Sequence, residues 1–391
     1  MSERVYLDWN ATAPLRPEAR AAMVAALDAV GNPSSVHYEG REARRLVEQA
    51  RERVAALVRA EPRNVVFTSG GTEANVMALS PALETPDHKS GFGLLLMSAI
   101  EHASVRAGGG FAAADMEEIP VGADGVVDLG ALERRMAGLQ RDRGRLPLVS
   151  IMAANNETGV IQPFEAAAGI IHAAGGFLHV DAVQVVGRIP FDIGRSGADL
   201  VTVSAHKLGG PQGVGALIRR SSALHFGDPM LKGGGQERGA RAGTENVAGI
   251  AGFGAAAAAA AAAMATDRER MRVLRDRLEA GLMNGATIVF GRNADRLPNT
   301  SLFTAPGIRA ETALINLDLD GFAVSSGSAC SSGKVTVSHV LAAMGVPGDL
   351  AAGAIRVSIG PATSENDIDR FLKAWTKRLA GLSKGKSGLA A

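Results

Sequence analysis

Lys207 is the residue whose type and position most clearly suggest covalent chemistry. It ends the run DLVTVSAHK and is the only lysine between Lys89 and Lys232, in a chain where eight of the forty-one basic residues are lysines. Arginine would supply charge equally well, but only lysine loses its proton and forms an imine with an aldehyde. The pattern therefore indicates Schiff-base chemistry, against the simpler alternative of a surface lysine at the end of a strand.

Asp181 closes another apolar run, FLHVDA, where its carboxylate could hold a positive charge at the edge of a sheet. Pyridoxal phosphate needs such a partner, because its ring nitrogen stays protonated opposite an aspartate and the ring then withdraws electrons from a substrate α-carbon. The alternative is an aspartate that forms a turn or caps a helix.

The segment TSGGTEAN, which contains Gly71 and Thr72, indicates a phosphate site. Its glycines follow the apolar run NVVF and precede a helical pattern, so backbone amides and the helix dipole would face an anion. An ordinary turn with a helix cap has the same pattern. Other polar residues after apolar runs could contact a flat cofactor or be plain loop and cap residues. They are His102, Asn155, Gln184, Ser204 and His206.

Cys330 is the only cysteine, which excludes an intramolecular disulfide and a zinc site built from several thiolates. The eight histidines show no ligand spacing either, so we expect no intrinsic metal. Cys330 lies among small residues in SSGSACSSGK, whereas free cysteine is usually buried, and Lys334 is near enough in sequence to favour a thiolate. A reactive thiol and a cysteine tucked under a loop both remain open.

Arg356 lies among apolar neighbours in AIRVSIG, a pattern typical of a strand. A guanidinium there needs an anionic partner. A substrate carboxylate held by two parallel hydrogen bonds would supply one, and a buried ion pair with an acid of the protein is the alternative.

The elements that position these residues alternate between short apolar runs and longer helical patterns from about residue 60 to residue 220. This predicts an α/β fold with a mostly parallel, helix-covered sheet, whose ligands collect beyond the carboxyl ends of the strands. The alanine-rich stretch 254–265 and the charged pattern after it predict one long helix. We expect a large domain over 20–262, and a smaller α+β domain over 1–19 and 263–391 that carries the cysteine loop at about 325–336.

Charge and composition narrow the class of partner. A formal charge of +1 favours neither nucleic acid nor an anionic membrane. We judge the uncharged stretch VAGIAGFG and its alanines too weakly apolar to span a membrane, and the start MSERVYLDW has no signal-peptide core, so we expect a cytoplasmic protein.

Taken together, the segments resemble the cysteine desulfurases, within the aspartate-aminotransferase-type fold (fold type I) of pyridoxal-phosphate enzymes. The motifs that carry the resemblance are YLDWNATAP, GNPSSVH, FTSGGTEAN, EHASV, NNETGVIQP, HVDAVQ, SAHKLGGPQGVGAL, GGGQERGARAGTENV, SSGSACSSG and IRVSIG. The form SSGSAC is similar to the nitrogen-fixation and iron-sulfur branch of the family. Departures are Trp9 in place of a tyrosine, Ala205 in place of glycine and Val183 in place of threonine, and none removes a group that the chemistry requires.

The resemblance assigns a role to each candidate. It implies that Lys207 binds the cofactor, Asp181 faces its ring nitrogen, His102 stacks on its ring, and Asn155 and Gln184 contact its phenolic oxygen. Gly71, Thr72, Ser204 and His206 would surround the phosphate, which a threonine of the other subunit, matching Thr244, completes in a homodimer. The substrate carboxylate would be held by Arg356 and Asn155.

The activity implied is removal of sulfur from L-cysteine. Lys207 would move the α-proton, and Cys330 would attack the substrate sulfur to give L-alanine and a persulfide, which passes to acceptors such as an iron-sulfur scaffold or a thiolation protein. Two alternatives remain: a selenocysteine lyase or aminotransferase of the same fold, and a catalytically idle sulfur-relay platform.

Overall fold

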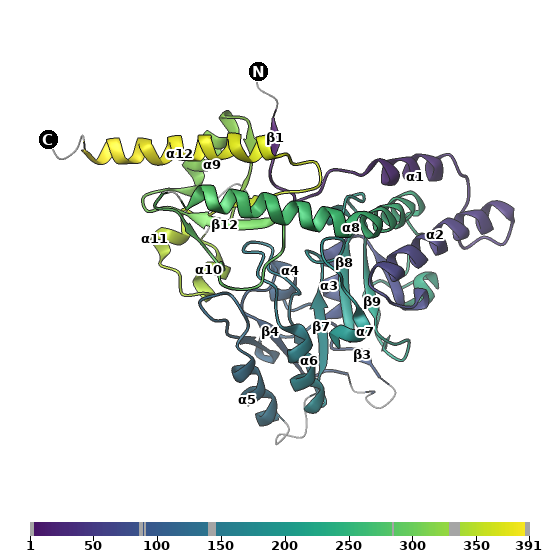
Figure 1. Ribbon diagram of the computed structural model, residues 1–391. Helices are drawn as coiled ribbons and strands as arrows, with labels where there is room; N and C mark the ends of the chain where they lie inside the picture. The colour runs from purple at the N-terminus through teal and green to yellow at the C-terminus, as the bar shows by residue number, and fades with distance from the viewer. Residues whose placement is uncertain are drawn as a thin grey trace.

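The computed structural model describes residues 4–85, 89, 91–139, 146–283, 285–327 and 337–387. Its centre is a seven-stranded sheet in the order β2-β9-β8-β7-β6-β4-β5 (Figure 1). Every strand points the same way except β9, which is antiparallel to both of its neighbours. The strands are β2 (Val65–Thr68), β4 (Leu94–Ser98), β5 (Met116–Ile119), β6 (Pro147–Ser150), β7 (Phe177–Asp181), β8 (Leu200–Ser204) and β9 (Gly215–Arg219). The predicted mostly parallel α/β sheet is confirmed.

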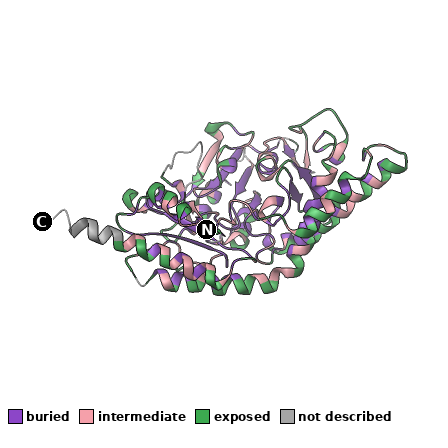
Figure 2. Ribbon diagram, turned by 90° about the horizontal axis from the view of Figure 1, so that it is seen from above, coloured by how far each residue is buried: buried purple, intermediate pink, exposed green. Residues whose placement is uncertain are grey.

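Both faces of this sheet are buried, as the continuous apolar runs require. In β4, Leu94 and Leu96 join one hydrophobic cluster, whereas Leu95 and Met97 join the cluster on the opposite face. The helices of the chain are α1 (Pro17–Leu27), α2 (Tyr38–Leu57), α3 (Gly71–Ala78), α4 (Ala103–Arg106), α5 (Leu129–Leu139), α6 (Phe164–Ala173), α7 (Ile193–Ser196), α8 (Val247–Leu282), α9 (Ala310–Leu319), α10 (His339–Ala343), α11 (Gly348–Ala351) and α12 (Glu365–Ser387). Residues of α2, α5, α6 and α8 contribute to the first cluster, and residues of α3 and α4 to the second. Figure 2 shows the result, with buried strands at the centre and exposed helix faces outside.

The long helix predicted from the alanine-rich stretch 254–265 and the charged pattern after it is confirmed as α8. This helix packs along α1, α2 and α12. Over an 18-residue window α8 has a mean hydropathy of 1.8, so by length and composition alone it is apolar enough to span a membrane. Our expectation that this stretch is too weakly apolar is therefore wrong on composition. Fifty-six per cent of that window is buried inside the structure, so the apolar surface packs against the protein core.

A second, antiparallel sheet in the order β11-β12-β15-β14 lies beyond α8. It consists of β11 (Ile288–Val289), β12 (Thr300–Thr304), β15 (Ile355–Ser358) and β14 (Ser325–Ser326), while β1 (Val5–Tyr6) pairs with β13 (Phe322–Ala323) and β3 (Leu83–Glu84) pairs with β10 (His225–Phe226). Helix α8 contributes Ile250–Ala260 to the core of the large sheet and Met271–Leu282 to the core around the second sheet. The division at residues 19 and 262 stays a prediction, because α8 continues through the second boundary.

Candidate active site

A cavity of about 400 Å³ opens at the carboxyl ends of the parallel strands, in the size range of small-molecule sites. Strands β2, β4, β7 and β8 end on this edge, so the segments that follow them come together there. The predicted residues that line the cavity are Gly71, Thr72, His102, Asp181, Gln184, Ser204, His206, Lys207 and Arg356.

Lys207 lies at the end of a short 3-10 helix, Ala205–Lys207, directly after β8. Its Nζ donates hydrogen bonds to the carbonyl oxygens of Asn10 at 2.7 Å and Ala11 at 2.8 Å. Burial and the charges of Arg356 and Arg188 together lower the pKa of Lys207 to about 7, against the opposing effect of two aspartates. A large fraction of the amine is therefore neutral at physiological pH, the state that attacks a carbonyl.

Asp181 ends β7 and is buried. Its two carboxylate oxygens accept hydrogen bonds from the amide of Asn75 at 2.8 Å and from the backbone N–H of Val183 at 3.0 Å. Glu101 lies nearby with full burial, which raises its pKa well above the usual range, and the charge of Asp181 raises it further. Asp181 is thus a carboxylate held by two N–H donors beside a buried acid whose pKa is raised.

His102 caps the short helix α4, and its Nδ1 lies 2.8 Å from the hydroxyl of Ser104. Because this contact holds the imidazole at the cavity wall, the ring is positioned to lie against a flat ligand.

The start of α3 meets the end of β8 at one end of the cavity. A Cβ atom added to Gly71 would lie 3.2 Å from the Cβ of Ser204 and 3.3 Å from Cγ2 of Val183, so glycine permits this close approach. A second hollow shares Gly71, Thr72, Ser204 and His206 with the cavity. Helix amides without internal partners, a hydroxyl and an imidazole form a donor set that suits a phosphate.

Gln184 and Arg188 form a buried, hydrogen-bonded pair beside Lys207. Arg188 donates to the side-chain and backbone oxygens of Gln184, and its other nitrogen lies 3.4 Å from the carbonyl oxygens of Trp9 and Lys207. Burial and, to a smaller extent, the charge of Arg356 together lower the pKa of Arg188 to about 9. Since the oxygen of Gln184 accepts from Arg188, its amide nitrogen is the atom left to donate, and it donates to the carbonyl of Asn10 at 3.2 Å.

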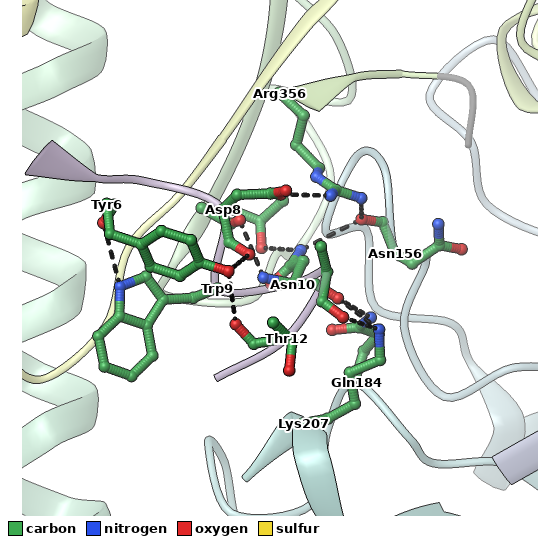
Figure 3. Close-up of polar contacts among 12 residues, drawn as sticks. Tyr6, Asp8, Trp9, Asn10, Thr12, Asn156, Gln184, Lys207 and Arg356 are labelled. Atoms are coloured by element: carbon green, nitrogen blue, oxygen red, sulfur yellow. Dashed lines mark hydrogen bonds and ion pairs between the residues drawn. The ribbon is translucent and has the colours of Figure 1, made fainter. Parts of the chain in front are cut away.

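Arg356 projects from β15 into the cavity from the opposite side, and residues 8–12 lie between it and Lys207 (Figure 3). Its guanidinium donates to Asp8 at 2.7 Å and to the carbonyl of Asn156 at 3.0 Å. The ion pair with an acid of the protein, one of our two alternatives, is therefore present. Nε of Arg356 is buried without a hydrogen-bond partner among the described residues, whereas the side chain as a whole lines the cavity, where a ligand carboxylate would compete with Asp8 for the guanidinium.

Asn155 is not among the residues that line the cavity, and its contact with cofactor and substrate stays a prediction. It is fully buried, and its side-chain oxygen accepts from the N–H groups of Glu157 and Thr158 at 2.9 Å each and from the Thr158 hydroxyl. Its amide nitrogen donates to the carbonyl of Ile100 at 3.1 Å. The side chain closes a turn, and the next residue, Asn156, lines the cavity and accepts from Arg356 through its carbonyl.

Thr244 is exposed and lines a different hollow, together with Ser69 and Gly213, so it does not reach the cavity of its own chain. Cys330 lies outside the described residues. The described residues contain no group of three or more His, Cys, Asp or Glu side chains that could hold a metal ion.

The sequence analysis missed several residues that build the site. Asp8, Asn10, Asn75, Asn156 and Arg188 all contact predicted site residues. Asp8 and Asn10 fall in the motif YLDWNATAP and Asn75 ends TSGGTEAN, so their presence in the quoted motifs is the signal that could have identified them.

Comparison with known proteins agrees with this geometry. The model of the family "Aminotransferase class-V" matches residues 5–371. The chain is 41% identical over 379 residues to a protein named cysteine desulfurase IscS from Dictyoglomus turgidum, covering 95% of this chain and 93% of the relative. It is 42% identical over 385 residues to a cysteine desulfurase from Cereibacter sphaeroides, covering 95% and 94%.

Solved structures give the same result. A NifS-like protein from Rickettsia africae superposes with a TM-score of 0.86 at 36% identity, covering 96% of this chain and 99% of that one. The structure of SspA in complex with cysteine superposes with a TM-score of 0.74 at 27% identity, covering 92% and 99%. The chain therefore belongs to the aminotransferase class-V family and, within it, to the cysteine desulfurases.

Proposed function

We propose that this protein removes sulfur from L-cysteine with pyridoxal phosphate as cofactor. The observation that carries the proposal is Lys207, a buried amine with a pKa of about 7 in a cavity that also holds a carboxylate and a phosphate-type donor set. Full-length similarity to cysteine desulfurases, and a structural relative solved with cysteine, support the choice of substrate.

The residues present fit the cofactor. Lys207 would bind its aldehyde, Asp181 would face its ring nitrogen, and His102 would lie on its ring. Gln184 would donate its amide to the phenolic oxygen, while Gly71, Thr72, Ser204 and His206 would hold the phosphate. The bound cofactor supplies an electron-withdrawing ring at the substrate α-carbon.

The side chains of the chain then bind the substrate and move its protons. Arg356 would hold the cysteine carboxylate, which would replace Asp8 as the anionic partner of the guanidinium. The second contact with the substrate carboxylate stays assigned to Asn155, as the motif NNETGVIQP implies. Once released as an amine, Lys207 would take the α-proton and return it, since its pKa lies near physiological pH.

Cys330 is proposed as the nucleophile. Its thiolate would attack the sulfur of cysteine, so that the S–S bond of a persulfide forms as the C–S bond breaks, and the carbon skeleton takes up protons and leaves as alanine. The described residues Ser325 and Ser326 line the cavity, and Cys330 follows Ser326 by four positions along the chain, a reach of at most about 14 Å. We further propose that the persulfide passes to acceptor proteins such as an iron-sulfur scaffold.

A homodimer is supported by exposed apolar side chains between α1 and the start of α2. Leu27, Val30 and Val36 are 72%, 82% and 88% exposed, and Val24 and Tyr38 extend the patch. A monomer has little reason to expose so many large apolar groups on one segment. Thr244, exposed and distant from its own cavity, would complete the phosphate site of the partner subunit. The cytoplasmic location stays a prediction.

The test is release of sulfide and alanine from cysteine by the wild type and by Cys330→Ser. Because the chain has one cysteine, any persulfide must form on Cys330, and a serine hydroxyl is far less nucleophilic. Wild type should gain about 32 Da on the peptide that contains Cys330, the mass of one sulfur. The serine variant should bind cofactor and cysteine but release almost no sulfide.

The alternatives predict other results. An aminotransferase would keep most of its activity in Cys330→Ser. An idle platform would release no sulfide in either form.

A further inference from the structure

A row of buried polar side chains leads from Asp181 into the sheet. Asn75 on α3 contacts Asp181 at 2.8 Å and Thr202 on β8 at 2.6 Å. The hydroxyl of Thr202 lies 3.3 Å from Nε2 of His179 on β7, and Nδ1 of His179 lies 2.8 Å from the hydroxyl of Ser150 on β6. All five residues are buried, so their polar hydrogens must be donated to protein acceptors nearby.

The hydrogen positions along this row follow from one fixed end. An ionised Asp181 only accepts, so the amide N–H of Asn75 faces it and the amide oxygen of Asn75 faces Thr202. The single hydroxyl hydrogen of Thr202 is then used on Asn75, and Thr202 accepts from Nε2–H of His179. Burial lowers the pKa of His179 to about 4, so its ring is neutral and Nδ1 accepts from Ser150.

The second amide hydrogen of Asn75 starts a branch. It is donated to the hydroxyl of Ser104 at 2.9 Å. Ser104 in turn donates its own hydrogen to Nδ1 of His102 at 2.8 Å, and its backbone N–H lies 3.2 Å from the same nitrogen. Nδ1 of His102 is therefore an acceptor, and the proton of the neutral ring lies on Nε2.

We propose that Asn75 is a positioning residue that acts on two sides of the cofactor site at once, holding Asp181 as an anion and fixing the tautomer of His102. The inference rests on the proposed function for its purpose. Hydrogen bonds from Ser150, His179, Thr202 and Asn75 all point toward Asp181, and aligned bonds strengthen one another in a buried site. The charge opposite the ring nitrogen is thereby held by a row of neutral groups and not by a cation, which would compete with that nitrogen.

The direct test reads the tautomers of His179 and His102 by NMR of the full-length chain labelled with 15N-histidine. The chain has eight histidines, and His179→Gln and His102→Gln assign the two signals. Between pH 6 and 8 His179 should stay neutral with its proton on Nε2 and none on Nδ1, and the neutral form of His102 should likewise carry its proton on Nε2. A proton on Nδ1 of His179, or a charged His179 at pH 6, would mean that the hydrogen bonds do not all run toward Asp181. Either result would overturn the proposal.

Thr202→Val and Thr202→Ser form a matched pair, because only serine keeps the hydroxyl. In the valine variant the proton of His179 should move to Nδ1, where Ser150 is the remaining acceptor, and the dissociation constant of added pyridoxal phosphate should rise about fivefold, the effect of one buried hydrogen bond. The serine variant should restore both values. An unchanged tautomer and affinity in Thr202→Val contradict the proposal.

If Thr202→Val does not fold, Ser150→Ala replaces it. His179 should then keep its proton on Nε2, and a shift to Nδ1 would refute the row. These measurements need no cysteine, so desulfurase activity of the wild type tests the proposed function separately. If the wild type has no desulfurase activity but shows the expected tautomers, the proposed function is wrong and the proposed role of Asn75 stands.

Discussion

Replacement of Lys207 by methionine should change how the stability of the cofactor-free chain depends on pH. Lys207 is an amine held in a buried position next to two guanidinium groups, and burial, Arg356 and Arg188 together lower its pKa from 10.5 to about 7. Methionine has similar length and no charge, so the substitution removes the titrating group and keeps most of the packing.

The sign follows from the protons that each state binds. Between pH 7 and 10.5 the unfolded chain keeps a proton on this lysine that the folded chain has lost, so the free energy of unfolding of the wild type rises with pH relative to the variant. One pH unit corresponds to at most about 1.4 kcal/mol. From pH 7.5 to 9.5 the difference between wild type and variant should therefore change by about 2 to 2.5 kcal/mol, in favour of the wild type.

Urea unfolding of the protein freed of cofactor with hydroxylamine measures this difference at both pH values. The other titrating groups are common to both proteins and cancel in the comparison. Lys232→Met, which removes an exposed lysine, serves as the control for loss of a lysine as such. A wild-type minus variant difference that changes by less than about 0.5 kcal/mol over this range would refute the lowered pKa of Lys207 and with it the main support for the proposed function.

Three further predictions concern residues around the cavity. Asp8→Asn should destabilise the free chain by about 2–4 kcal/mol in urea unfolding, because Arg356 loses its anionic partner, and should lower KM for cysteine, whose carboxylate replaces it; an unchanged KM would separate Arg356 from substrate binding. Asn155→Ala should lower the unfolding free energy by about 2–3 kcal/mol, since it removes a buried acceptor of three hydrogen bonds, and should lower kcat/KM, whereas Asn156→Ala should leave the unfolding midpoint in place because its contacts with Asn10 and Arg356 use the backbone carbonyl; an unchanged kcat/KM in Asn155→Ala would separate Asn155 from substrate binding. Thr244→Ala should weaken binding of pyridoxal phosphate about fivefold, and coexpression with Lys207→Ala should restore one intact site per mixed dimer; activity no higher than that of the separate variants would place Thr244 in its own subunit's site.

The sheet edge could be predicted from the sequence because the strands are buried on both faces. Runs such as LLLMS and LVTVS have few polar residues, so the first polar groups after them mark the strand ends. In a parallel sheet these ends lie together, which is why Lys207, Asp181, Ser204 and Gly71 were found without coordinates.

Neighbouring polar residues could not be told apart in the same way. Asn155 and Asn156 have the same side chain, and the turn alone decides that the first is used by the N–H groups of Glu157 and Thr158. The sequence carries no local signal for this choice, since both residues suit a turn.

Distant residues were missed for a different reason. Asp8 reaches Arg356 across 348 positions of the chain, and Asn75 reaches Asp181 across 106. Pairings of this length depend on how the two sheets pack, and no spacing pattern within one segment records that.

Residues 8–12, which lie between Arg356 and Lys207, also determine when during synthesis of the chain the complete cavity can form. The backbone N–H of Asn10 donates to the hydroxyl of Ser358 at 2.9 Å, and that of Trp9 to the Ser358 carbonyl at 3.2 Å. The carbonyls that receive Lys207 are thus held by a strand synthesised some 348 residues later, roughly 20–70 s at usual rates of translation. Until β15 has emerged and paired, the lysine has no fixed acceptors, so the cofactor can be loaded into a finished site only after synthesis of most of the chain.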